Sequence, residues 1–172
     1  DLGPLEPRLP EVLKTSTGQV ELAPAAFLAD LPRLVEALGE APNGHLALIG
    51  RRHVRSNNSW MHNVEVLVKG KDRCTLQVHP DDAARLGLVD GGAAEVASRV
   101  GKVVAPVEVT DEILAGVVSL PHGWGHDDPA ADMAVAAAHA GVNCNVLTDD
   151  GPLDPLSGNA VLNGVPVTVT PA

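Results

Sequence analysis

Short valine-rich runs, separated by brief connections, are the feature that most constrains the fold of this chain of 172 residues. Aromatic residues make up 2% of the sequence, so the core must be built from Val, Leu, Ile and Ala, a composition that favours strands. No connection holds a full-length crossover helix, so we expect six or seven short strands in a small β-barrel rather than a parallel sheet. The candidate strands are 20–22, 46–49, 64–68, 75–78, 94–98, 102–109, 117–120, 160–162 and 165–170.

Helices are expected to be few and short, which gives a mainly β fold with short helices. Residues 24–38 carry apolar side chains at helical spacing but include Pro32, so they predict two helical turns or one broken helix. Residues 80–86 start with Pro80 and acidic residues and stop at Gly87, which is typical helix punctuation. The alanine-rich residues 130–140 predict a further helical segment.

Length and composition indicate one domain with an arm in front of it. Residues 1–44 are expected to be a proline-rich linker arm and a short helical segment, and residues 45–172 the barrel domain. The sequence lacks an initiator Met, a secretory leader and an apolar run of about 18 residues, so we expect a cytoplasmic piece of a longer polypeptide that does not enter a membrane. Cys74 and Cys144 are expected to be reduced thiols, with a disulfide left open.

The polar stretch 50–63, GRRHVRSNNSWMHN, is the first candidate binding loop, since it follows the apolar run 45–49. Six of the twelve basic residues lie between positions 51 and 73 in a chain of net charge -10. Guanidinium forks match phosphate oxygens, so we expect an anion here, although a solvated loop with surface ion pairs is the alternative. Nucleic acid is not the expected anion, because the chain is acidic and poor in aromatic residues. The candidate ligand residues are Arg51, Arg52, Arg55, Asn57, Asn58, Ser59, Trp60, His62 and Asn63.

A second candidate loop is the glycine-rich stretch 121–126. Gly123 and Gly125 predict close backbone approach to a ligand, with His122, Trp124 and His126 lining it. The two histidines have the four-residue spacing of metal ligands on a helix, but the glycines argue against a helix. The alternative is two loop histidines that make ordinary hydrogen bonds.

Asn143 and Asn145 form the third candidate. In an extended segment their side chains would point opposite ways, so one of the two amides would face a ligand. A turn in which the Asn side chains bond the local backbone is the alternative.

Together these stretches resemble a known family, the C-terminal dinucleotide-binding domain of the molybdopterin oxidoreductases, which include dimethyl sulfoxide reductase and formate dehydrogenase. The resemblance spans about residues 45–170, and it lies in the order and spacing of several weak motifs. These motifs are 48–52 with 58–60, 79–83 with 87–91, 121–125, and 145–148 with 154–158.

The resemblance implies a double-psi β-barrel, of the aspartate decarboxylase-like kind, that covers a bis-molybdopterin guanine dinucleotide cofactor. The loops 51–63 and 122–126, with Asn143 and Asn145, would contact this cofactor. The partners would be missing N-terminal catalytic domains of the same polypeptide, which would hold the molybdenum ligand and any iron–sulfur cluster. The whole would be an oxidoreductase like formate dehydrogenase or nitrate reductase, and the fragment alone would not be catalytic.

Two other readings of the sequence compete with this resemblance. One is a stand-alone β-barrel module that binds a protein or a small anion. The other is a small metal-dependent hydrolase that uses His122 and His126.

Overall fold

The computed structural model describes residues 3–39 and 44–172, which belong to two compact units, Asp1–Ala41 and Pro42–Ala172. The first unit contains one helix, α1 (Ala25–Gly39), and turns before it. The prediction of a broken helix was wrong, because α1 continues through Pro32. Pro32 has no N–H group to donate to the carbonyl four residues before it. Because no residue of α1 is buried, water can bond that carbonyl instead. Residues 20–22 were predicted as a strand and are not one; within the described chain they pair with no strand.

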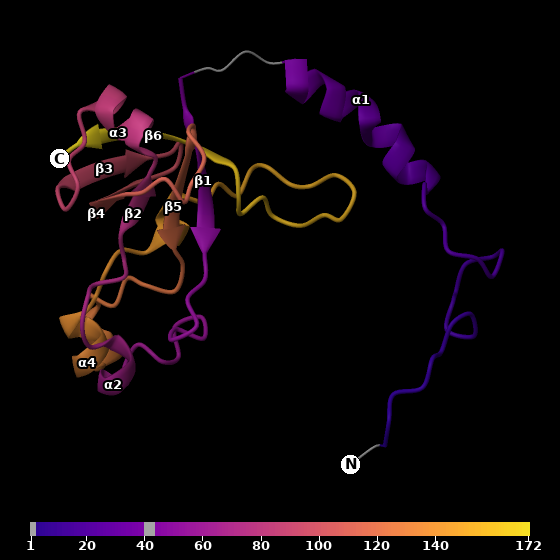
Figure 1. The fold of residues 1–172 in the computed structure, drawn as a ribbon, viewed down its shortest axis with the longest axis horizontal. Coiled ribbons are helices and arrows are strands. Elements are labelled where there is room, and N and C mark those ends of the chain that lie inside the picture. Colours follow the sequence, from indigo (N-terminus) through magenta and orange to yellow (C-terminus); the bar gives the residue numbers. More distant parts are fainter. Residues whose placement is uncertain (1–2, 40–43) are drawn as a thin grey trace. The chain divides into compact units, whose positions relative to one another are not determined.

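The second unit is built on a closed barrel of short strands (Figure 1). Its strand order is β1-β5-β2-β4-β3-β6, so neighbours in space are mostly distant in sequence. The strands are β1 (Leu46–Arg51), β2 (Leu76–Val78), β3 (Ala93–Ala97), β4 (Lys102–Val109), β5 (Val117–Pro121) and β6 (Val165–Pro171).

Two of the strand pairs in this barrel are parallel, which distinguishes it from a simple meander. β1 runs parallel to β5, and β2 runs parallel to β4, while the other pairs are antiparallel. A closed barrel with two such parallel pairs is a double-psi β-barrel, so the predicted fold is confirmed. The register pairs Ala47 with Val117 and Arg51 with Pro121, so β1 and β5 end together. The loops that follow them therefore start at the same edge of the barrel.

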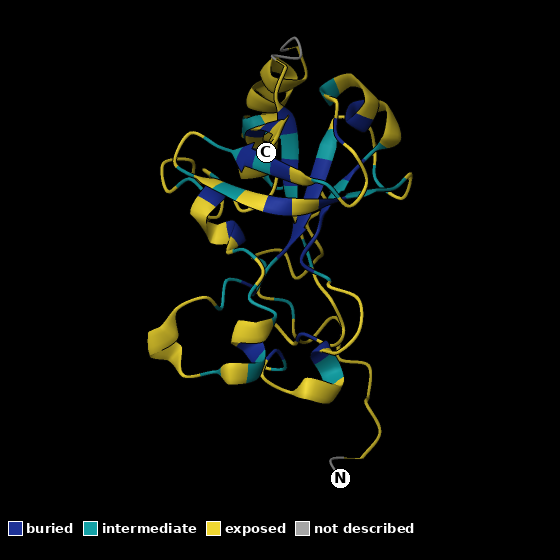
Figure 2. Cartoon of the chain, turned by 90° about the vertical axis from the view of Figure 1, so that its left-hand side faces the viewer, coloured by how far each residue is buried: buried dark blue, intermediate teal, exposed yellow. Residues whose placement is uncertain are grey.

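Buried residues, dark blue in Figure 2, gather on the strands of the barrel. The core that they form is mainly aliphatic. Along β6 the side chains of Val165, Val167 and Val169 are buried and those between them are exposed, as alternation along a strand requires. Leu76 and Leu120 are fully buried at the centre. All members of the core lie between positions 46 and 169 of the described chain, so the first unit contributes none of them.

Further helical segments lie between the strands in the described part of the second unit. α3 (Pro80–Leu86) forms as predicted, and His79 caps it by accepting a hydrogen bond from the backbone N–H of Asp81. The alanine-rich segment forms η1 (Pro129–Ala131) and α4 (Ala134–Ala138), and η2 (Cys144–Leu147) follows. None of the helices in the described parts of the chain is long and apolar enough to cross a membrane.

Two predicted strands in the second unit are wrong. Residues 65–68 form the short helix α2 (Glu65–Val68) despite their alternating valines. The Arg73 guanidinium donates hydrogen bonds to the carbonyls of Leu67, Val68 and Lys69, a tertiary cap that satisfies the end of the helix. Residues 160–162 form only an isolated bridge between Leu153 and Ala160.

The location of the core predicts that the barrel is stable without the first unit. We expect removal of residues 1–41 to change the thermal midpoint of the barrel by less than about 2 °C, because no buried core contact is lost. Scanning calorimetry of the full and the shortened chain measures this. A fall of about 5 °C or more would show that the arm belongs to the same cooperative unit.

Candidate functional site

Residues 52–63 leave β1 as a compact series of turns rather than as an open loop. The Ser56 N–H donates to the carbonyl of His53 at 3.0 Å, and the Met61 N–H donates to the carbonyl of Ser56 at 3.1 Å. At the tip, Asn57 and Asn58 adopt left-handed backbone conformations with φ of 42° and 65°. Asn tolerates this region better than most residues, and such conformations concentrate at functional sites.

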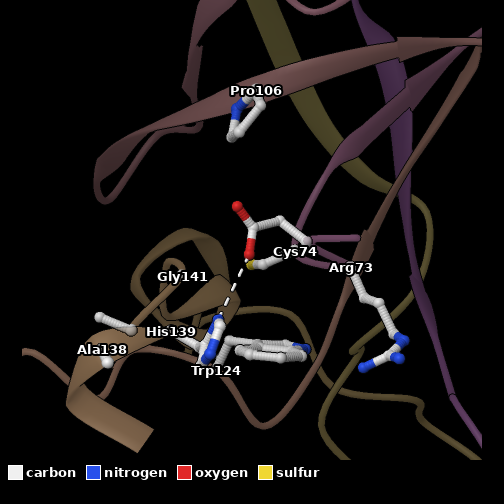
Figure 3. A pocket seen from close by; sticks show the side chains of 9 residues that line it. Arg73, Cys74, Pro106, Trp124, Ala138, His139 and Gly141 are labelled. Atoms are coloured by element: carbon white, nitrogen blue, oxygen red, sulfur yellow. Dashed lines mark hydrogen bonds and ion pairs between the residues drawn. The ribbon is translucent and has the colours of Figure 1, made fainter. Parts of the chain in front are cut away.

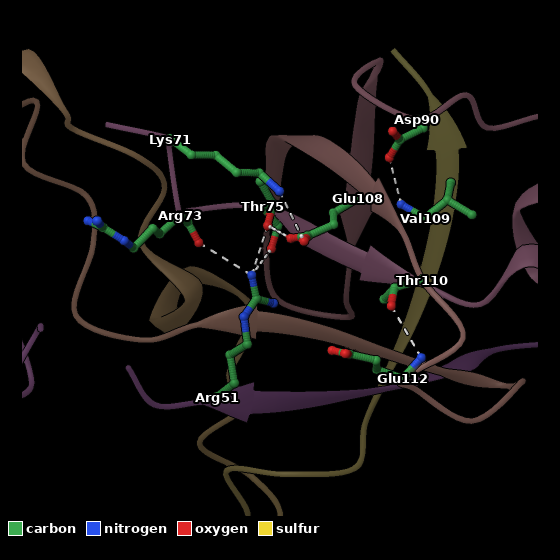
Figure 4. Close-up of polar contacts among 9 residues, drawn as sticks. All are labelled: Arg51, Lys71, Arg73, Thr75, Asp90, Glu108, Val109, Thr110 and Glu112. Carbon is green, nitrogen blue, oxygen red and sulfur yellow. Dashed lines mark hydrogen bonds and ion pairs between the residues drawn. The ribbon is translucent and has the colours of Figure 1, made fainter. Parts of the chain in front are cut away.

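Arg51, at the end of β1, is the one arginine of this stretch that the barrel itself uses (Figure 4). Its guanidinium donates to the carbonyl of Ser119 at 2.7 Å and to the carbonyl of Thr75 at 2.8 Å, with a further bond to the Thr75 hydroxyl. Burial lowers the pKa of Arg51, and the nearby Glu108 carboxylate opposes this effect. These bonds tie β1 to β5 and to the start of β2, so they compete with the predicted anion contact of Arg51.

Arg52 and Arg55 are instead exposed at the surface of the loop. Arg52 donates to the side-chain oxygen of Asn58 at 2.7 Å, which orients its guanidinium. The Arg55 side chain has no hydrogen-bond or ion-pair partner among the described residues. These two guanidinium groups therefore keep most of their donors for a ligand.

A hollow of about 490 Å³ lies between this loop and the loop after β5. No carboxylate lines it, although the chain as a whole has 22 acidic and 12 basic residues. The hollow therefore suits an anion that needs hydrogen-bond donors. Its lining residues are Arg52, His53, Val54, Asn57, Asn58, Met61 and His122.

The glycines of the second loop make it pack against its neighbours. Gly123 has φ of 87°, and a Cβ atom there would overlap the carbonyl oxygen of Asn58. Gly125 has φ of 102°, and its Cβ would lie 2.6 Å from the Cβ of Asn143. Protein atoms fill both places where a Cβ would stand, so the glycines allow close packing of the three candidate loops. Close backbone approach to a ligand at these glycines stays a prediction.

Beneath the loops, His62 and Trp124 stack with ring centroids 3.9 Å apart. His62 Nδ1 lies 2.8 Å from His126 Nε2, so one of these nitrogens donates to the other. Burial, and then the neighbouring His126, lower the pKa of His62, which keeps it neutral at neutral pH. His62 Nε2 and Trp124 Nε1 are buried without a hydrogen-bond partner in the described chain.

The contacts of these histidines also bear on the hypothesis that His122 and His126 bind a metal ion. His126 is paired with His62 on the first loop, and His122 lines the hollow. In the described ranges, 3–39 and 44–172, no group of three His, Cys, Asp or Glu side chains is arranged to hold a metal ion.

The remaining candidate residues have structural contacts or lie at the surface. Asn63 Oδ1 accepts hydrogen bonds from the N–H groups of Val135 and Ala136 at the start of α4. Asn143 Oδ1 accepts from the Asn145 N–H at 3.0 Å, which caps η2. The extended segment that we expected at Asn143 and Asn145 was therefore wrong, and the local-turn alternative holds. Asn145 is exposed, Ser59 is half-buried, and Trp60 is 79% exposed.

Both cysteines are buried free thiols, and burial raises the pKa of each. Cys74 borders a second hollow, of about 210 Å³, together with Trp124 and His139 (Figure 3). In that hollow the His139 ring lies 3.4 Å from a carboxylate oxygen of Asp72. His53 and Arg73 were not among the predicted ligand residues, although both lie within the basic run 51–73.

Comparisons with known proteins identify the family of this chain. Residues 46–166 match the model of a family described as the molydopterin dinucleotide binding domain, so the chain belongs to this family, as predicted. Biotin sulfoxide reductase of Cereibacter sphaeroides is 36% identical over 117 residues, which cover 67% of this chain and 15% of that protein. Dimethyl sulfoxide/trimethylamine N-oxide reductase of Rhodobacter capsulatus is 37% identical over 60 residues, 35% of this chain and 7% of that protein.

A solved structure supports the fold alone. Acetylene hydratase from Pelobacter acetylenicus superposes with a TM-score of 0.62 at 23% identity, over 84% of this chain and 20% of that one. The chain thus corresponds to a small part of its longer relatives.

The contacts of Arg51 predict that its replacement damages the fold. We expect Arg51→Met to lower the free energy of unfolding by about 1–3 kcal/mol, since the carbonyls of Thr75 and Ser119 lose their partner. Urea unfolding followed by circular dichroism measures this, with Arg52→Met as the control. Arg52 is exposed, so the control should change stability by less than about 0.5 kcal/mol. Equal stabilities for both variants would contradict the structural role of Arg51.

Proposed function

We propose that this chain covers the dinucleotide part of a bis-molybdopterin guanine dinucleotide cofactor in a molybdenum-dependent oxidoreductase. The observation that carries the proposal is the hollow between the loops after β1 and β5, which donors line and carboxylates do not. Membership of the molydopterin dinucleotide binding family supports the same cofactor class. The pyrophosphate bridge of a dinucleotide is an anion, and guanidinium and amide groups are its usual partners.

The residues present fit such a group. Arg52 and Arg55 would supply the positive charge, and Arg52 is already oriented by Asn58. The side chains of Asn57 and His122 would add further hydrogen-bond donors at the rim. When bound, the cofactor supplies the molybdenum centre at which the redox chemistry takes place. The part of this chain is to bind and orient the anionic bridge and to keep water from it.

We propose that the rest of the enzyme lies in preceding domains of the same polypeptide, which are the partners of this chain. Those domains would hold the molybdenum ligand and determine the substrate. The two relatives compared above are named as reductases of sulfoxides or an N-oxide. The whole enzyme is therefore proposed to be either a reductase of this kind or an enzyme like formate dehydrogenase or nitrate reductase. An iron–sulfur cluster in those domains and a cytoplasmic location stay predictions.

The exposed arginines should carry the affinity for a pyrophosphate bridge. We expect the double change Arg52→Gln and Arg55→Gln to weaken binding of diguanosine pyrophosphate, two guanosines joined through a pyrophosphate, by about ten- to hundredfold. Calorimetric titration at low salt measures this, and the difference should shrink as salt is added.

Lys102→Gln is the control away from the site; it removes one positive charge, against two in the double variant. Lys102 forms a surface ion pair with Glu95 and does not line the hollow. We expect its effect on affinity to stay within about twofold. Equal losses from the control and from the double variant would mean that net charge, rather than this site, attracts the ligand.

A further inference from the structure

His53 lies where two hollows meet. It lines the hollow of about 490 Å³ beside Asn58 and His122, and it also lines one of about 280 Å³ beside Lys71 and Gln77. The two hollows therefore share a wall residue and adjoin each other at His53. A small anion would occupy only one of these two hollows.

The hollow of about 280 Å³ has a small excess of positive charge. Arg51, Lys71 and Arg73 line it against two carboxylates, Asp72 and Glu108. The charges of Lys71 and Glu108 offset each other at 3.3 Å, and Asp72 lies 3.4 Å from the His139 ring. Basic groups therefore line both hollows, on either side of His53.

The ring of His53 is held in one orientation. The backbone N–H of Arg55 donates to His53 Nδ1 at 3.1 Å. Because Nδ1 accepts this bond, the neutral ring carries its proton on Nε2 and presents a donor there. Burial and the charges of Arg73, Arg55 and Arg51 lower the pKa of His53, so the ring is neutral at neutral pH.

We propose that His53 is a ligand-binding donor at the junction of the two hollows, and that the site takes a dinucleotide whose pyrophosphate bridge lies at His53. The Nε2–H group donates to a bridge oxygen, and the two halves of the ligand extend into the two hollows. This inference rests on the proposed function and adds to it a residue, a second subsite and a minimum ligand length.

The test compares ligand length and the chemistry at position 53. In the full chain labelled with ¹⁵N, diguanosine pyrophosphate should shift the backbone amides of both Asn58 and Gln77, on the two sides of His53. Guanosine monophosphate should shift one side only, since it is too short to span both hollows. The His53 ring should keep its proton on Nε2, and that resonance should move on binding. His79, which caps α3, is the internal reference and should not move.

Two variants of His53 distinguish the contribution of its hydrogen-bond donor from that of the rest of the ring. We expect His53→Ala to weaken binding of diguanosine pyrophosphate by about three- to tenfold, and His53→Gln, which keeps a donor near the place of Nε2, to stay within about twofold. His53 is exposed, so neither change should unfold the chain. Circular dichroism checks this.

The outcomes distinguish this inference from the proposed function. If the dinucleotide binds through Arg52 and Arg55 but the Ala variant binds equally well, or if the shifts stay on the Asn58 side, the inference is wrong and the proposed function stands. If the unaltered chain binds no dinucleotide, both are contradicted. Loss in the Ala variant, retention in the Gln variant and shifts on both sides support both.

Discussion

The half-buried guanidinium of Arg51 is the interaction on which this edge of the barrel depends. β1 and β5 are parallel and end together, and the start of β2 lies on the other side of β5. Arg51 bonds the carbonyls of Ser119 and Thr75 there. A planar group with several fixed donors suits this place better than a lysine would. Because this edge is fixed, the loops that follow β1 and β5 leave the barrel in defined directions.

The loops above this edge are fixed to one another rather than left open. Gly123 packs on the backbone of Asn58, Gly125 packs on Asn143, and His62 pairs with His126. The exposed donors, above all those of Arg52 and Arg55, are therefore held on a rigid base. Such a base lowers the entropy cost of binding an anion that would otherwise have to order the loop. The adjacent parallel strands β1 and β5 thus determine where the ligand-binding groups of the two loops come together.

Local patterns in the sequence predicted much of the barrel, because alternation along a strand and the punctuation of α3 depend on neighbouring residues. They failed at residues 65–68, where Arg73 caps a helix from outside the segment. The candidate loops could be found because they are unusually polar and rich in glycine. The sequence could not show which of these side chains keep their donors for a ligand. Arg51 and Arg52 are adjacent and chemically identical, yet Arg51 turns into the barrel and Arg52 stays exposed. Such differences arise only when distant strands pair.

The proposed function requires that the loops after β1 and β5 form one anion-binding surface. Mapping the chemical shift of every backbone amide during titration with diguanosine pyrophosphate examines this surface residue by residue. We expect the largest shifts in residues 52–58 and 122–123, and we expect them to weaken as salt rises. Shifts confined to the face formed by β3 and β4, or absent at residues 52–58, would contradict it.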